Sequence, residues 1–293
     1  MMNGWLDENT LFRPPAEGKS LIFQVTRGCP HNRCLFCGMY KTVSYREYDL
    51  RKIEADIECA LRQGFGNARR IFLADADAFS LSTEKLESIL LLLNRKFPLL
   101  SRVSFYAGGH SILSKTPEEL RRLKELKAST LYLGLESGSE ELLKRVGKAC
   151  TAKAMAEAVI RAQGCGLKVS VMILLGLGGT EFSRIHAEKT AEVLNYMRPK
   201  LLSALRFIEI PGLTPMFKGY HPLSEKGSAV ELQTILSLLN LDGTVFRANH
   251  SSIPFPLEGR FPKDREKWIA TLDAAVKTGI LSESGPGPLP LFL

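Results

Sequence analysis

The chain has 293 residues, is 45% hydrophobic and carries a net charge of +8 at pH 7, so it can bury one large core. It has no stretch of the roughly 20 uninterrupted apolar residues that a membrane-spanning helix needs, which excludes a membrane protein. Acidic residues and prolines occupy the N-terminus where a secretory signal would be basic and then apolar, so we expect a cytoplasmic protein. The lysines and arginines are mixed with acidic residues, which favours a solvated surface over a nucleic-acid-binding stripe.

Short apolar runs rich in β-branched and aromatic residues predict six strands, over residues 21–26, 70–74, 102–106, 130–135, 168–175 and 204–210. Amphipathic segments between them predict helices over residues 46–64, 82–97, 116–126, 139–146, 151–164 and 181–197. This alternation favours an α/β fold, a partial (β/α)6 TIM-like barrel of parallel strands with a C-terminal appendage. Ligand sites in such barrels lie at the carboxyl ends of the strands, so the loop after each strand is where chemistry is expected.

The pattern divides the chain into three parts. We expect an N-terminal segment over residues 1–17, a core barrel over residues 18–212, and a C-terminal extension over residues 213–293 that covers or flanks the active site. The extension has helical patterns near residues 228–240 and 263–278, with a loop between them, and it ends in a segment rich in glycine and proline.

A group of three cysteines follows the first strand, in the segment GCPHNRCLFCGMY. Cys29, Cys34 and Cys37 are separated by four and two residues, and soft thiolates on one loop suit zinc or an iron–sulfur centre. A structural zinc site needs a fourth ligand, for which His31 is the nearby candidate, so a zinc-binding interaction module is one alternative. A cluster with three protein ligands keeps one iron open to a small molecule, which implies catalysis. The remaining cysteines are interpreted as isolated thiols: Cys59, Cys150 and Cys165.

This cysteine loop resembles that of the radical S-adenosylmethionine (SAM) superfamily. The usual loop of that family has three residues in the first gap and an aromatic residue before the third cysteine. Here the first gap has four residues, a variant Cys-x4-Cys-x2-Cys loop, and Phe36 is the aromatic residue. The resemblance implies that Cys29, Cys34 and Cys37 bind a [4Fe-4S] cluster and that SAM is the second cofactor, with Phe36 beside it.

Two later strand ends resemble the branch of oxygen-independent coproporphyrinogen oxidases and methylthiotransferases. After the second strand, where the family commonly has Gly-Gly-Glu for the amine of SAM, the chain has Asp75 and Asp77, and one of these is expected to serve that amine. The fourth strand ends in a Gly-Leu-Glu-Ser-Gly segment, in which Glu136 is expected to accept hydrogen bonds from a ribose or an ammonium group. Lys148, which follows the next short helix, is a candidate to face the same site.

Four further positions are candidates to contact SAM or substrate. The fifth strand leads into a glycine turn that begins at Gly176, and the resemblance places this turn against adenine. Arg161, in the helix before that strand, is a candidate for the SAM carboxylate. Asn249 and His250 are candidates to touch substrate, with a structural hydrogen bond the favoured interpretation for His250.

The function implied by the resemblance is reductive cleavage of SAM at the [4Fe-4S] cluster to a 5′-deoxyadenosyl radical. That radical would abstract hydrogen from an unidentified small-molecule substrate, with a flavodoxin or ferredoxin as electron donor. A non-catalytic chaperone of the same fold that binds SAM and haem is the alternative from another class. The sequence assigns no catalytic residue beyond the cofactor ligands.

Overall fold

The computed structural model describes residues 11–210 and 212–285, in two compact units. The first unit contains residues 11–32, 42–133 and 161–169, and the second contains residues 33–41, 134–160, 170–210 and 212–285. The expected N-terminal segment and the C-terminal tail lie partly outside the described residues, at 1–10 and 286–293.

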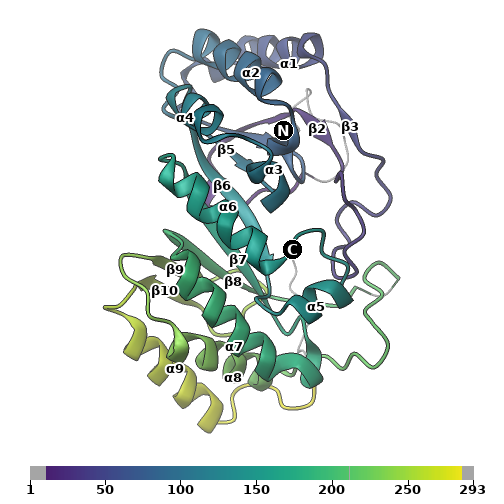
Figure 1. Ribbon diagram of the computed structural model, residues 1–293, viewed down its shortest axis with the longest axis vertical. Helices are drawn as coiled ribbons and strands as arrows, with labels where there is room; N and C mark the ends of the chain where they lie inside the picture. Colours follow the sequence, from purple (N-terminus) through teal and green to yellow (C-terminus); the bar gives the residue numbers. More distant parts are fainter. Residues whose placement is uncertain (1–10, 211, 286–293) are drawn as a thin grey trace. The chain divides into compact units, whose positions relative to one another are not determined.

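The first unit alternates strands and helices along the chain (Figure 1). Its elements are η1 (Pro15–Glu17), β1 (Leu21–Gln24), β2 (Thr26–Arg27), β3 (Arg46–Glu47), α1 (Leu50–Arg62), η2 (Phe65–Asn67), β4 (Arg70–Ala74), η3 (Ala78–Ser80), α2 (Thr83–Lys96), β5 (Arg102–Tyr106), α3 (Gly109–Leu113), α4 (Pro117–Glu125) and most of β6 (Ala128–Glu136). Strands β1, β4, β5 and β6 are hydrogen-bonded neighbours in that order and all run parallel, while β2 and β3 form a small antiparallel pair.

The parallel register brings the ends of neighbouring strands to one edge. Gln24 at the end of β1 pairs with Ala74 at the end of β4, so the loops that follow these two strands start side by side. The cysteine loop and the Asp75 segment therefore begin at the same edge, as parallel topology predicts.

Side-chain caps start helices α2 and α4 of this unit. The Ser82 hydroxyl accepts a hydrogen bond from the Lys85 N–H at the start of α2. Thr116 and Glu119 form a reciprocal capping box at the start of α4, with Pro117 in the first turn. The helices then bury apolar faces against the sheet, where Phe79 and Phe105 meet edge to face at 5.4 Å.

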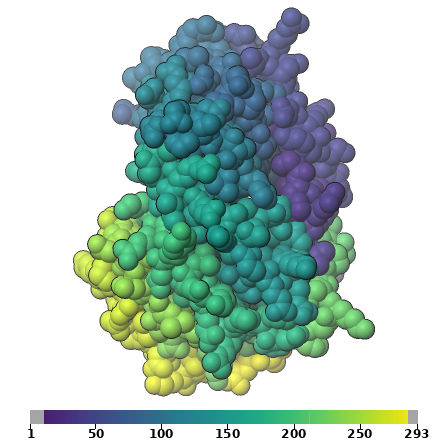
Figure 2. Space-filling model, in the orientation of Figure 1, coloured from purple at the N-terminus to yellow at the C-terminus, as the bar shows by residue number. Residues whose placement is uncertain are grey.

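The second unit contains residues 33–41, the end of β6 from Gly134, and most of the chain after it. Its elements are α5 (Glu140–Arg145), α6 (Ala152–Gly164), β7 (Lys168–Leu175), α7 (Gly179–Met197), β8 (Leu201–Arg206), α8 (Glu225–Leu238), β9 (Val245–Ala248), β10 (Leu257–Arg260) and α9 (Arg265–Lys277), of which α6 and β7 include residues of the first unit. Strands β7, β8 and β9 run parallel, and β10 pairs antiparallel with β9. Atoms of α9, in yellow, lie on the surface of this unit (Figure 2).

The α/β class and the six predicted barrel strands are confirmed, although the sixth covers residues 201–206 rather than 204–210. Two strands of the C-terminal region, β9 and β10, were not predicted. Their sequences, Val-Phe-Arg-Ala and Leu-Glu-Gly-Arg, lack a β-branched run and clear alternation, and their pairing with β8 and with each other defines them instead. None of the described helices is both long and apolar enough to span a bilayer.

Candidate functional site

The residues predicted to bind cofactors are divided between the two units. The first unit contains Cys29, Asp75, Asp77 and Arg161, and the second contains Cys34, Phe36, Cys37, Glu136 and Gly176.

Asp75 lies at the carboxyl end of β4 and is only 3% exposed. Its Oδ2 accepts a hydrogen bond from the Gly28 N–H at 3.0 Å, and its own N–H donates to Thr26 Oγ1 at 3.0 Å. Gly28 directly precedes Cys29 and has a φ of +75°, a conformation that glycine adopts readily. The Asp75 carboxylate thus fixes the turn that carries the first cysteine, a role that sequence reasoning missed, and its contact with the amine of SAM remains a prediction.

Asp77 is half-buried and connects the end of β4 to the start of α3. Its Oδ2 accepts a hydrogen bond from Ser111 Oγ at 2.5 Å, and its backbone carbonyl accepts one from Ser80 Oγ at 2.7 Å. A Cβ atom at Gly108 would lie 2.7 Å from the same Oδ2, so glycine is needed for this close approach. Of the two aspartates, Asp77 is the less buried, and its role toward SAM also remains a prediction.

Arg161 binds main-chain oxygens at the end of a helix. Its Nη1 donates to the Leu113 carbonyl at 3.0 Å and to the Lys115 carbonyl at 3.4 Å. Leu113 is the last residue of α3 and Lys115 lies just beyond it, where a cation satisfies acceptors that the helix leaves open. These contacts give Arg161 a structural role within the first unit, and its contact with the SAM carboxylate stays a prediction.

The second half of the cysteine loop is anchored by main-chain contacts in the second unit. The Leu35 N–H donates to the Val146 carbonyl at 2.8 Å, just after α5, and Lys41 Nζ donates to the Cys34 carbonyl at 2.8 Å. The Cys37 N–H donates to the Cys34 carbonyl at 3.3 Å, which folds the two-residue gap into a turn. The backbone between the second and third cysteines is thereby fixed, while their side chains are half-exposed.

The three thiols have the donor chemistry that an iron–sulfur cluster needs. All three cysteine side chains are half-exposed, and soft thiolates on an accessible loop suit iron–sulfur clusters. Over residues 11–210 and 212–285, no three cysteine, histidine or acidic side chains lie close enough, as they stand, to hold a metal ion. The assignment of Cys29, Cys34 and Cys37 as ligands therefore remains a prediction based on the sequence and on donor type.

A cation connects the cysteine turn to the end of β6. Lys148 Nζ donates to Glu136 Oε1 at 3.0 Å, and both side chains are less than one-fifth exposed. Burial acts to lower the pKa of Lys148, but attraction to the Glu136 carboxylate and the Cys34 and Cys37 thiols outweighs it, so the pKa is raised. Lys148 is thus a charged ammonium that offsets negative charge from both groups.

Glu136 itself adopts a left-handed backbone conformation, with a φ of +61°. Its carboxylate folds back over Gly134, where a Cβ atom would lie 1.9 Å from Oε1. Only glycine at that position allows this placement, which explains the Gly-Leu-Glu order at the strand end.

Phe36 and the glycine turn meet in one apolar cluster of the second unit. The cluster is built from Leu142, Val146, Leu177 and Phe182, with Phe36, Leu174, Met216 and Phe217 packed against it. Leu177 directly follows Gly176, so the predicted aromatic residue of the cysteine loop and the predicted adenine turn share a packing core. Lys148 Nζ lies 5.8 Å from the centroid of the Phe36 ring.

The turn at Gly176 is held by two side chains that sequence reasoning did not select. Gly176, with a φ of +75°, donates its N–H to Glu231 Oε1 at 2.7 Å, and its carbonyl accepts a hydrogen bond from the Tyr220 hydroxyl at 2.9 Å. Glu231 lies on the buried face of α8, between Ser228 and Leu232. A carboxylate on the apolar face of a predicted helix is the signal that could have identified it.

The C-terminal loop residues make local contacts. His250 Nδ1 lies 2.9 Å from Ser252 Oγ and accepts a hydrogen bond from the Ser252 N–H at 3.2 Å, which confirms the structural interpretation. Asn249 Nδ2 donates to Glu258 Oε2 at 3.1 Å. Both side chains stabilise the connection between β9 and β10.

Comparison with known proteins gives one family match, to the radical SAM superfamily over residues 23–191. A putative methylthiotransferase of Methanocaldococcus jannaschii is 28% identical over 52% of this chain and 34% of its own length. The heme chaperone HemW of Bacillus subtilis is 26% identical over 46% of this chain and 36% of its own length. The chain therefore spans about a third of the length of these curated relatives.

A solved structure supports the fold. Coproporphyrinogen III oxidase (HemN) from Escherichia coli, described as a radical SAM enzyme, aligns with a TM-score of 0.53 at 15% identity, over 74% of this chain and 51% of that chain. At this identity the likeness confirms the architecture, a partial TIM-like fold.

Proposed function

Because the chain belongs to the radical SAM superfamily, we propose that it is an enzyme that binds a [4Fe-4S] cluster through Cys29, Cys34 and Cys37 and cleaves SAM reductively. The family match covers more than half of the chain and includes all three cysteines. The chemistry that such a cluster supplies when bound is one-electron reduction of the SAM sulfonium, which gives methionine and a 5′-deoxyadenosyl radical.

The arrangement around Lys148 is the observation that carries this proposal. Lys148 Nζ lies 5.8 Å from the ring centroid of Phe36 in the cysteine loop and also pairs with Glu136 at the end of β6, so one cation lies next to both the predicted cluster loop and a predicted SAM ligand. In this proposal Glu136 accepts hydrogen bonds from the ribose or amine of SAM, and the Gly176 turn lies against adenine. In the first unit, Asp75 or Asp77 serves the amine.

The substrate is proposed to be a small molecule that loses a hydrogen atom to the radical. A flavodoxin or ferredoxin is the proposed electron donor. The protein's task is to orient the reacting carbon and to exclude water and other hydrogen donors.

Anaerobic reconstitution with iron and sulfide tests the proposal. We expect about four iron atoms per chain, visible absorbance of a [4Fe-4S] cluster, and release of 5′-deoxyadenosine from SAM after addition of dithionite. A colourless protein that retains zinc after anaerobic purification would overturn the proposal in favour of the zinc-binding module.

The similarity to HemW favours a second candidate function, a chaperone that binds haem. Titration with haem under the same anaerobic conditions separates the two functions. A stoichiometric change in the haem spectrum, without 5′-deoxyadenosine formation under any reductant, would favour the chaperone.

Replacement of Lys148 by methionine is expected to lower the free energy of unfolding by about 2 kcal/mol, because the half-buried Glu136 carboxylate loses its charged partner. It is also expected to weaken SAM binding to the reconstituted protein. Lys144→Met removes the same charge from an exposed position of α5, and we expect it to change stability by less than about 0.5 kcal/mol. Urea denaturation and calorimetric SAM titration of both variants measure the difference, and equal effects would contradict the role of Lys148.

A further inference from the structure

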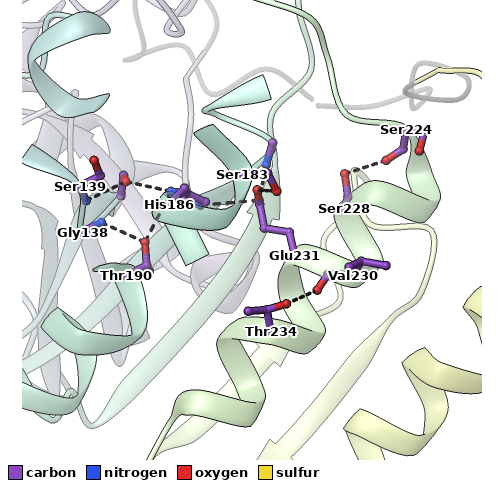
Figure 3. A network of polar contacts seen from close by, with 12 residues as sticks. Gly138, Ser139, Ser183, His186, Thr190, Ser224, Ser228, Val230, Glu231 and Thr234 are labelled. Atoms are coloured by element: carbon purple, nitrogen blue, oxygen red, sulfur yellow. Dashed lines mark hydrogen bonds and ion pairs between the residues drawn. The ribbon is translucent and has the colours of Figure 1, made fainter. Parts of the chain in front are cut away.

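A buried polar network in the second unit joins helices α7 and α8 (Figure 3). Its central side chains, His186 of α7 and Glu231 of α8, are both completely inaccessible to solvent. Burial of ionisable groups is costly unless hydrogen bonds compensate for the lost water. The hydrogen-bond partners of His186 and Glu231 therefore identify the backbone segments that this network fixes.

Glu231 holds the glycine turn that follows β7. One carboxylate oxygen accepts the Gly176 N–H at 2.7 Å, and the other accepts the Ser183 hydroxyl at 2.6 Å. Gly176 follows the last residue of β7 and has a left-handed backbone, and its buried N–H needs an acceptor. Glu231 supplies that acceptor from a helix 55 residues further along the chain.

His186 holds the turn that follows β6, directly after Glu136. Its Nδ1 lies 2.8 Å from Ser137 Oγ, and Ser137 Oγ also accepts the Ser139 N–H at 3.0 Å. One helical turn later on α7, Thr190 Oγ1 accepts the Gly138 N–H at 2.9 Å. Two consecutive residues of this turn, Ser137 and Gly138, are thereby fixed to one helix.

The two holding residues face each other. His186 Nε2 lies 3.6 Å from Glu231 Oε1, in contact but beyond hydrogen-bond distance. The hydrogen bond from Ser183 of α7 to the Glu231 carboxylate links the two helices, and through them the Ser137 turn and the Gly176 turn. If Nδ1 accepts the Ser137 hydroxyl proton, the imidazole proton is on Nε2 and points toward the carboxyl group. Burial lowers the pKa of His186 to about 4 and raises the pKa of Glu231 to about 7, so near neutral pH the imidazole is uncharged.

We propose that His186 and Glu231 are positioning residues that hold the Ser137–Gly138 turn and the Gly176 turn in a fixed relation for SAM. The inference rests on the proposed binding of SAM by Glu136 and the Gly176 turn. Neither residue touches the ligand in this arrangement. They act through the backbone of the two turns, and the C-terminal extension thereby contributes α8 to the binding site.

Hydrogen–deuterium exchange of the intact protein tests the link without any cofactor. Glu231→Ala is expected to speed amide exchange by about tenfold in peptides that cover residues 174–180 and also in those that cover residues 134–139, because both turns lose a shared support. Thr234→Val, which removes an exposed hydroxyl from the same helix, is the matched control and should leave both peptides unchanged. Faster exchange confined to residues 174–180 would overturn the link.

Conservative variants separate positioning from general stability. In Glu231→Gln the amide oxygen can still accept the Gly176 N–H and the amide nitrogen can donate to Ser183 Oγ, so this variant should fold and keep slow exchange in both turns. In the reconstituted protein, Glu231→Ala and His186→Ala are expected to raise the Kd for SAM about tenfold, while Glu231→Gln stays within about twofold. An unchanged Kd in variants whose turns exchange faster would overturn the positioning role.

The pH dependence of stability gives an independent measurement of the pair. A carboxyl group with a raised pKa in the folded state loses stability as pH rises from about 4.5 to about 7, whereas an imidazole with a lowered pKa gains stability from about 4 to about 6.5. Relative to the parent, the unfolding free energy of Glu231→Gln should therefore rise with pH over the first window. Relative to the parent, the unfolding free energy of His186→Gln should fall as pH rises from about 4 to about 6.5. If the unfolding free energies of all three proteins vary with pH in the same way, the assignment of His186 and Glu231 as a buried titrating pair is overturned.

The outcomes also distinguish this inference from the proposed function. If the parent protein binds no SAM, the proposed function fails and the positioning role fails with it, although coupled exchange of the two turns would still be observed. If the parent binds SAM and the variants show neither coupled exchange nor a raised Kd, the positioning role alone is overturned.

Discussion

Replacement of Cys37 by alanine is expected to leave the reconstituted protein without a stable cluster and to lower 5′-deoxyadenosine formation by on the order of 100-fold or more. The reason is that a three-thiolate site has no spare protein ligand. The turn between Cys34 and Cys37 is already fixed by the Leu35 and Lys41 hydrogen bonds, so the backbone should persist in the variant. Iron content, the visible spectrum and product chromatography measure the effect.

Cys59→Ala is the matched control for this substitution. Cys59 is half-exposed on α1, where its sulfur lies 3.6 Å from Gln63 Nε2, and its removal should leave iron content and SAM cleavage unchanged. Full iron loading in Cys37→Ala, or equal losses in both variants, would contradict the assignment of Cys37 as a ligand.

Gly138→Ala is expected to lower the free energy of unfolding by at least about 3 kcal/mol, because there is no space for a methyl group at this turn. A Cβ atom at Gly138 would lie 2.1 Å from the Lys189 carbonyl oxygen and 2.6 Å from the Thr190 Cα. Both atoms belong to the backbone of α7, which cannot move aside as a flexible side chain can. Chemical denaturation measures the loss, and SAM binding should weaken as well because this turn follows Glu136.

The same substitution at Gly164 serves as the control. Gly164 is the last residue of α6, and a Cβ atom there would meet nothing within 4 Å. Alanine at a helical position restricts the unfolded chain, so stability should rise by up to about 1 kcal/mol. A destabilised Gly164→Ala would contradict the open space at the end of α6, and a Gly138→Ala variant as stable as the parent would contradict the close packing against α7.

The sequence was most informative where local pattern decides the structure. Each of the six barrel strands carries a concentrated apolar run. Ser82 and Ser139 cap helices, and such a cap depends on neighbouring residues only. Strands β9 and β10 could not be predicted from local sequence, because their few residues mix apolar, charged and glycine positions. They exist because β8 offers an edge for pairing.

In the candidate site, too, the residues next to predicted strands could be identified from the sequence, whereas their distant supports could not. Glu136 and Gly176 follow predicted strands directly, so motif and position together could identify them. The supports of these residues, His186 and Glu231, lie 49 and 55 residues away from Ser137 and Gly176 in the chain, and such distances are closed only by folding. Asp75 shows a third case, in which the residue was identified but its contact with Gly28 was not.

The two strands added by the C-terminal region also cover a sheet edge that could otherwise pair with another chain. Without β9, the Leu201–Arg206 strand would present a row of unpaired backbone groups, which is a template for pairing between chains. The outermost strand of the second unit, β10, instead exposes Glu258 and Arg260, and charged side chains at an edge oppose such pairing. A fragment that ends at residue 212 is therefore expected to aggregate, and studies of the barrel should retain the extension.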